Sequence, residues 1–140
     1  YDLGTSRLSS SIIDTMKNNV TTNNEESIEA LHLVKKQAIT MKEAILTSDL
    51  IKFSEVMNEG WEHKKRVAKG ITNPKIDKIY DSAIKAGALA GRISGAGGGG
   101  FMLFFCEPNN RYKVIKRLNE LGGQIRSYQF VKTGLTTWRT

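Results

Sequence analysis

Six consecutive residues, 95–100, contain five glycines and constrain the fold of this chain more than any other segment. The residues on either side are mostly apolar and predict two short strands, Leu89–Ser94 and Phe101–Cys106. A β-hairpin needs only two turn residues. Glycine reaches positive φ and lets another backbone or a ligand approach closely, and successive amides can form an anion-binding nest. We therefore expect a functional loop here, with a plain hairpin turn as the alternative.

The loop matches two nucleotide-binding patterns poorly. Gly95, Gly97 and Gly100 satisfy G-x-G-x-x-G, but in dinucleotide-binding folds that motif opens a helix. Here the apolar run that starts at Phe101 is typical of a strand, so the dinucleotide reading is rejected. A Walker A loop is also excluded, because no Gly-Lys-Ser/Thr follows.

Helical periodicity and capping residues predict five helices around this hairpin. They begin near Ser9, at Glu25 (ending at Leu46), after a Ser48 cap (stopping at Gly70), after Asn73-Pro74 (stopping at Gly87), and at Pro108 (stopping at Gly122-Gly123). Their expected buried stripes are Ile28, Leu31, Ala38, Met41 and Ile45 in the second helix, and Leu50, Phe53, Met57 and Trp61 in the third. A strand stub at 1–4 and a last strand over 124–132 complete a β-α-β-β-α-β order. The expected fold is α+β, a ferredoxin-like (split βαβ) sandwich with additional helices and an antiparallel sheet covered on one face.

Charge is distributed unevenly along the 140 residues. Residues 1–60 carry 6 basic and 9 acidic side chains, a net −3, whereas residues 61–140 carry 15 and 5, a net +10. Such an excess is typical either of an anionic partner (nucleic acid, lipid head groups or a phosphorylated small molecule) or of a solvated helix face. The single cysteine, Cys106, excludes an intramolecular disulfide framework. Neither a membrane-spanning apolar run nor a signal peptide is visible, so we expect a cytoplasmic protein.

The segment Gly91–Phe101 resembles the third conserved motif of the GHMP small-molecule kinases, a strand-loop-strand written roughly K-x-x-G-A-G-G-G-G. Arg92 stands where the superfamily often has Lys, which keeps the charge but changes its geometry. Further segments look like the heptose phosphate kinase branch, which acts on D-glycero-D-manno-heptose phosphates. They are Thr5-Ser6-Arg7, Trp61, Lys64-Lys65-Arg66, Gly70-Ile71, Asn73-Pro74, Ile76-Asp77, Tyr80, Ala86-Gly87-Ala88 and Gly134–Trp138.

The resemblance implies that residues 1–140 are the C-terminal domain of an ATP-dependent kinase whose N-terminal ATP-binding domain is absent from this chain. ATP and Mg²⁺ would be bound mainly by that domain, and no catalytic or metal-binding residue is expected here. The implied acceptor is D-glycero-D-manno-heptose 7-phosphate, phosphorylated at its anomeric hydroxyl for nucleotide-activated heptose and cell-surface polysaccharide synthesis. The fragment alone is expected to be inactive. Its expected partners are the sugar phosphate, ATP and its own N-terminal domain, without nucleic acid or membrane; a homodimer stays open.

The resemblance also implies site residues. The loop expected to contact the ATP-phosphate loop and the substrate consists of Ser94, Gly95, Ala96, Gly97, Gly98, Gly99 and Gly100. The candidates for the substrate phosphate are Ser6, Arg7, Lys65 and Arg92, since cationic side chains suit phosphate oxygens.

The alternative to a kinase is a non-catalytic ferredoxin-like binding module, either RNA-binding or dimerising. Phe101, Phe104 and Phe105 on a central strand are weakly similar to the base-stacking aromatics of RNA-recognition sheets. His32 and His63 lack partners at metal-ligand spacing, so both are interpreted as structural.

Overall fold

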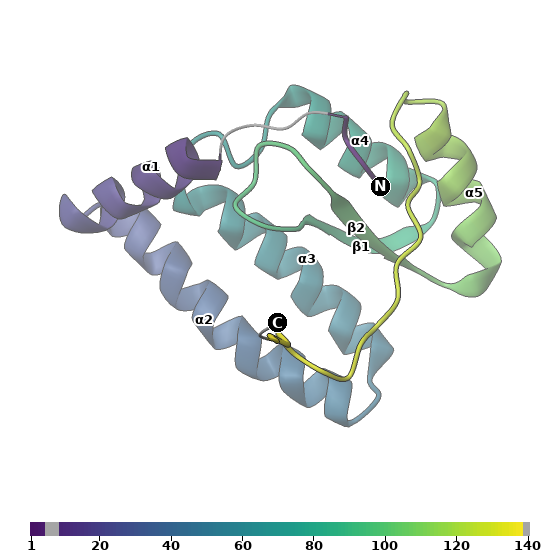
Figure 1. The fold of residues 1–140 in the computed structure, drawn as a ribbon, viewed down its shortest axis with the longest axis horizontal. Coiled ribbons are helices and arrows are strands. Elements are labelled where there is room, and N and C mark those ends of the chain that lie inside the picture. Colours follow the sequence, from purple (N-terminus) through teal and green to yellow (C-terminus); the bar gives the residue numbers. More distant parts are fainter. Residues whose placement is uncertain (5–8, 139–140) are drawn as a thin grey trace.

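The computed structural model of the chain describes residues 1–4 and 9–138. Within these residues, five helices and a two-stranded hairpin give an α+β fold, in which α3, α4 and α5 pack against the hairpin and α2 packs on α3 (Figure 1). In chain order the elements are α1 (Ser9–Thr21), α2 (Glu25–Leu46), α3 (Leu50–Val67), α4 (Pro74–Lys85), β1 (Ala88–Ile93), β2 (Met102–Cys106) and α5 (Pro108–Asn119). Among these helices, none is long and apolar enough to cross a bilayer.

The hairpin forms one side of a sheet with the predicted split-βαβ strand order, and β1 is its edge strand. β1 and β2 pair antiparallel, with Ile93 opposite Met102 and Ala88 opposite Cys106. On the other side of β2, Asp2 forms isolated antiparallel bridges with both Phe101 and Gln124. The order across the sheet is therefore Gln124, Asp2, β2, β1, as a ferredoxin-like chain requires.

The last strand is much shorter than predicted, because only Gln124 of residues 124–132 is bridged. Asp2 and Gln124 exchange both backbone hydrogen bonds in antiparallel register, at 2.8 and 3.2 Å, and no described residue bridges to 125–132. The side chains there are accordingly exposed, including those of Phe130 (91%) and Leu135 (95%).

Helix α3 lies along the open edge of β1 and beside α2 (Figure 1). The Asn58 side chain donates to the carbonyl of Leu89 at 2.7 Å and accepts from the Tyr80 hydroxyl at the same distance. An unpaired strand edge exposes backbone groups that need partners. Side chains of α3 thus satisfy part of the edge of β1 and fix the helix against the hairpin.

The buried face of α2 differs in part from the predicted stripe, of which Ile28, Leu31 and Met41 are half-buried. Ser27, Ala30 and Ala44 are buried, whereas Ala38 is exposed and Ile45 is 58% exposed. Small residues let α2 approach α3 closely, and Gly60 of α3 contributes to this, because a Cβ there would lie 3.2 Å from the Gln37 Oε1. Close helix packing therefore selected small side chains over large aliphatic ones.

Two predicted helix boundaries are also corrected. The N-cap of α3 is Asp49, whose carboxylate accepts from the Lys52 amide at 2.8 Å, and Ser48 instead adopts φ 56°. Helix α3 ends at Val67, before Gly70. The Val67 carbonyl accepts hydrogen bonds from Ser27 Oγ (2.6 Å) and Asn19 Nδ2 (3.0 Å), so neighbouring helices satisfy the end of α3.

The core lies between the hairpin and helices α3, α4 and α5. Its largest fully buried apolar side chains are Trp61, Met57, Ile71, Ile76, Ile93, Met102 and Leu118. The predicted start of α4 is confirmed, since Asn73 Oδ1 accepts from the Lys75 and Ile76 amides and Pro74 occupies the first turn.

Candidate functional site

The glycine-rich loop, Ser94–Gly100, connects β1 to β2 in a conformation that glycine alone adopts readily. The φ angles are 84° at Gly95, 120° at Gly97, 75° at Gly98 and 84° at Gly100. Residues that carry a Cβ atom are disfavoured in this region of the Ramachandran map. Four of the five glycines in the loop are therefore explained by backbone conformation.

The middle of the loop packs against the connection between α3 and α4. The Gly98 amide donates to the carbonyl of Ile71 at 2.8 Å, and a Cβ on Gly97 would lie 2.8 Å from the Ile71 Cα. Ile71 is fully buried, as are Gly98 and Gly99. This is a close backbone approach, one of the two kinds of approach that the glycine run allows, so the loop is more than a plain hairpin turn.

The start of the loop is accessible and its end is held by the N-terminal residues. Ser94 and Gly95 are exposed, while Ala96, Gly97 and Gly100 are half-buried. The Leu3 amide donates to the Gly100 carbonyl at 2.9 Å, and the Met102 amide donates to the Tyr1 carbonyl at 2.8 Å. The loop is thus a fixed surface whose first residues face solvent.

Lys64 is the basic side chain that reaches the loop from α3. Its Nζ donates to the carbonyl of Gly95 and to that of Ile93, the latter at 3.4 Å. Burial, together with the nearby charge of Arg92, lowers the pKa of Lys64 from 10.5 to about 8. Lys64 was not among the predicted site residues, although its spacing from Met57 and Trp61 places it on the buried face of the helix.

The other two basic residues at the end of α3 contact different groups. Lys65 Nζ pairs with Glu62 at 2.7 Å and lies 5.8 Å from the centre of the Trp61 ring. Arg66 pairs with Glu29 of α2 at 2.6 Å and with Glu26 at 3.5 Å. The structure therefore separates three adjacent cations, and only Lys64 of the three has a contact with the loop among the described residues.

Of the other residues predicted to contact the substrate phosphate, the structure describes only some. Arg92 is half-buried on β1, two residues before the loop, and its charge acts on Lys64. Ser6 and Arg7 lie outside the described residues. Lys65 and Arg92 stay candidates for the substrate phosphate.

Aromatic residues of β2 are not arranged as an open stacking platform. Phe105 packs edge-on against Phe53 of α3, with ring centroids 5.0 Å apart. The Phe104 ring covers Gly91, where an added Cβ would lie 2.6 Å from it. Only Phe101 of these three aromatic side chains is largely exposed (51%).

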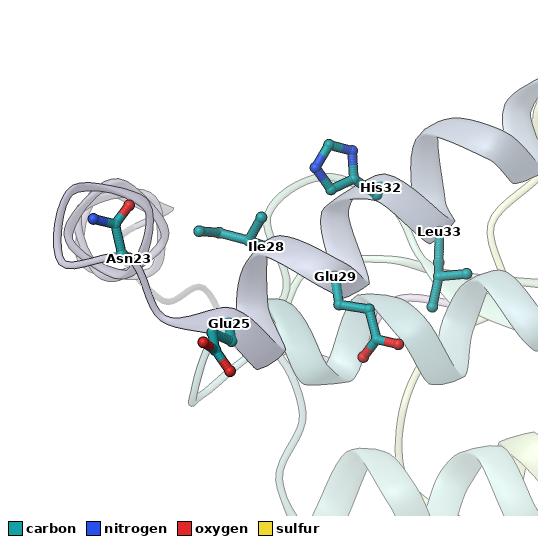
Figure 2. A pocket seen from close by; sticks show the side chains of 6 residues that line it. All are labelled: Asn23, Glu25, Ile28, Glu29, His32 and Leu33. Carbon is teal, nitrogen blue, oxygen red and sulfur yellow. The ribbon is translucent and has the colours of Figure 1, made fainter.

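A surface hollow lies at the start of α2, away from the glycine-rich loop. It is lined by Asn23, Glu25, Ile28, Glu29, His32 and Leu33. Figure 2 shows that Ile28 and His32 project from one side of the helix and Glu29 and Leu33 from the other. Glu29 is moreover paired with Arg66, so the hollow offers no catalytic constellation among these residues.

Comparison with known proteins identifies a family for the part of the chain that contains the glycine-rich loop. The family model for the C-terminal domain of GHMP kinases, "GHMP kinases C terminal", matches residues 41–124. This range includes α3, the glycine-rich loop, the Ile71 connection on which the loop packs, and α5, but not the N-terminal residues that hold the end of the loop.

The chain is similar in sequence to two heptose phosphate kinases. It is 39% identical over 115 residues to D-glycero-alpha-D-manno-heptose 7-phosphate kinase of Campylobacter jejuni, covering 82% of this chain and 34% of the relative. A crystal structure of a D-glycero-D-manno-heptose 1-phosphate kinase from Bacteroides thetaiotaomicron is 32% identical with a TM-score of 0.50, covering 84% of this chain and 34% of that one.

The fold is shared more widely than the sequence. The structure of Leishmania major mevalonate kinase with R-mevalonate superposes with a TM-score of 0.70 at 17% identity, over 85% of this chain and 36% of that one. This chain spans about a third of the length of the heptose 7-phosphate kinase it matches. By the match to the family model and by its fold, the chain belongs to the family of GHMP kinase C-terminal domains.

Proposed function

We propose that this chain is the C-terminal domain of an ATP-dependent sugar-phosphate kinase and that Ser94–Gly100 forms one wall of its phosphoryl-transfer site. The observation that carries the proposal is the seating of the loop on Ile71, which fixes its backbone before any ligand binds. Phosphoryl transfer depends on positioning and charge stabilisation. A preformed loop with accessible first residues and nearby cations supplies both.

The side chains at the loop suit phosphate. Lys64 contacts the loop, and Arg92 lies two residues before it. Cationic groups and backbone amides bind phosphate oxygens, whereas Mg²⁺ prefers carboxylate and other oxygen ligands. We therefore assign ATP and Mg²⁺ mainly to the part of the relatives that this chain does not cover, about two thirds of their length, together with the catalytic group. When bound there, Mg²⁺ would neutralise charge on the transferred phosphoryl group.

The proposed acceptor is D-glycero-D-manno-heptose 7-phosphate, phosphorylated at its anomeric hydroxyl for nucleotide-activated heptose synthesis in the cytoplasm. The 39% identity to a heptose 7-phosphate kinase supports this choice. Ser6, Arg7, Lys65 and Arg92 are the side chains proposed to meet its 7-phosphate. A domain that lacks the ATP-binding half should be inactive alone.

The test joins this chain to the N-terminal part of its kinase in one protein and incubates it with Mg-ATP and heptose 7-phosphate. ³¹P NMR should detect an anomeric phosphate in addition to the 7-phosphate. Heptose without the phosphate, galactose and mevalonate serve as comparison acceptors, and each should react at least about tenfold more slowly, since loss of a charged contact of this kind costs about 1.5–3 kcal/mol. Faster turnover of one comparison acceptor would reassign the substrate, and the absence of turnover with all four would refute a sugar-phosphate kinase.

A further inference from the structure

We propose that Lys64 is a positioning residue that fixes the first turn of the glycine-rich loop by holding the carbonyls of Ile93 and Gly95 with one ammonium group. The inference rests on the proposed function for its kinetic consequence, but its structural basis is independent of substrate. It concerns α3, an element outside the glycine-rich motif.

The two carbonyls bracket the point where strand becomes loop. Ile93 is the last residue of β1 and is fully buried, whereas Gly95 is exposed with φ 84°. Between them, the Ser94 amide donates to the Phe101 carbonyl at 2.9 Å and closes the hairpin ladder. Lys64 therefore acts one residue beyond the last ladder bond that the structure shows at this end.

Glycine makes an external restraint necessary. A loop with glycine at five of seven positions loses more backbone entropy on ordering than other sequences, and its own side chains cannot hold it. Three contacts supply restraints: Lys64 holds the first turn, the Gly98 amide on Ile71 holds the middle, and the Leu3 amide on the Gly100 carbonyl holds the end. The segment between Gly95 and Gly98 is thereby fixed at both ends.

Helix α3 is fixed against β1 by contacts that precede Lys64 in the sequence. Asn58, six residues earlier, binds the Leu89 carbonyl of the same strand, and Trp61 between them is buried (1% exposed). Lys64 thus continues a row of α3 contacts along the edge of β1. It differs from Asn58 in that it reaches beyond the strand into the loop.

The electrostatics at Lys64 are unfavourable, which argues against an incidental contact. The group is partly buried, and the charge that acts on it from β1 is the like charge of Arg92. On its own helix, Glu62 is paired with Lys65 instead. Among the described residues, the oxygens that Lys64 Nζ contacts are therefore uncharged backbone carbonyls. A cation kept at this cost is typical of a functional position.

The experiment compares three variants in the full-length kinase. Lys64→Met keeps the aliphatic stem but removes the donor, Lys64→Arg restores a cationic donor, and Lys52→Met removes an exposed lysine of the same helix that pairs with Glu55. Lys64→Met should lower kcat about tenfold to hundredfold with KM for ATP within about threefold, because misplaced groups lose transition-state stabilisation. Lys64→Arg should recover part of kcat, and Lys52→Met should match the wild type.

Hydrogen exchange gives a second readout that does not need activity. The hydrogen-bonded amides of Ser94 and Gly98 should exchange at least about tenfold faster in Lys64→Met, since loop opening becomes easier, while amides of α2 stay unchanged. Unchanged exchange in the loop, or faster exchange throughout the domain, would overturn the positioning role. If Lys64→Met does not fold, Lys64→Gln, which keeps one neutral donor, is measured in the same way.

The two proposals fail separately. A wild-type protein without kinase activity would refute the proposed function, while the exchange experiment would still decide on Lys64. Conversely, an active wild type with unaltered kcat in Lys64→Met would refute only the positioning role.

Discussion

The amide of Gly98 donates a 2.8 Å hydrogen bond to the carbonyl of Ile71, and this contact joins the glycine-rich loop to the connection between α3 and α4. The connection is itself fixed, because Asn73 caps α4 and the Thr72 hydroxyl bonds to Asp77 at 2.5 Å. The conformation of the loop is thus set by a neighbouring element and not by the hairpin alone.

Gly97→Ala should directly disturb the contact between the loop and Ile71. The added methyl group would lie 2.8 Å from the Ile71 Cα, at a residue with φ 120°. We expect a loss of about 2–4 kcal/mol in the free energy of unfolding, from the clash and the backbone strain together, measured by urea denaturation of the chain. In the full-length kinase, kcat should fall as well.

Gly122→Ala is the matched control for the Gly97 variant. Gly122 also has a positive φ, 81°, but nothing lies within 4 Å of an added Cβ there. It should show only the backbone cost of about 1–2 kcal/mol. Equal losses for the two variants would mean that the contact with Ile71 is unimportant.

Lys64 should titrate near pH 8. Its pKa is lowered from 10.5 to about 8, so the folded protein releases this proton more readily than the unfolded chain. Between these two values the unfolded state binds more protons, and stability therefore rises with pH. The free energy of unfolding of the wild type, relative to that of Lys64→Met, should increase from about pH 8 towards pH 10.5. NMR of the lysine Cε signals should give the midpoint directly; a Lys64 midpoint above about 10 would show that the group is not desolvated.

The Val67 carbonyl should be sensitive to loss of its two donors. Ser27 Oγ binds it at 2.6 Å in a buried position, and Asn19 Nδ2 binds it at 3.0 Å. Ser27→Ala should cost about 1–2 kcal/mol. With Asn19→Ala added, the double variant should cost more than the sum of the singles, because the carbonyl loses both partners.

Ser54→Ala provides the comparison for Ser27. Ser54 is also buried, but its hydroxyl donates to the Ile51 carbonyl of its own helix. Its removal should change stability by less than about 0.5 kcal/mol. A similar cost for Ser27 and Ser54 would contradict a specific role for the Val67 contact.

At the start of α3, we expect substitutions of two adjacent residues to have opposite effects on stability. Asp49→Ala removes the cap on the Lys52 amide and should cost about 1 kcal/mol. Ser48→Gly should instead stabilise the chain by up to about 1 kcal/mol, since Ser48 has φ 56°. Thermal denaturation of both variants checks the assignment, and destabilisation by Ser48→Gly would restore Ser48 as the cap.

Local signals predicted the elements well. The Asn73-Pro74 start of α4, the bounds of α2 and the two strands around the glycines were expected, and the structure confirms them within one or two residues. Each depends on chemistry within one turn of the chain: a capping side chain, a fixed proline φ or an apolar run. The split-βαβ order followed from their sequence, because few topologies accommodate it.

Contacts between distant residues were not predictable in the same way. Three adjacent cations at the end of α3 look alike in the sequence, yet Lys64 reaches the loop while Lys65 and Arg66 pair with acidic side chains. Likewise, α2 buries Ala30 and Ala44 whereas Ile45 is 58% exposed, a choice that depends on how α2 packs against its neighbours.

The sequence by itself determined where most helices and strands begin, and it indicated that the glycine-rich loop allows a ligand or another backbone to approach closely. Only the tertiary structure decided that this backbone belongs to Ile71, that Lys64 holds the first turn of the loop, and that the strand at Gln124 ends after one bridge. The physical reason is range: propensities and caps act between neighbours in the chain, whereas hydrogen-bond partners and packing distances depend on residues that only folding brings together.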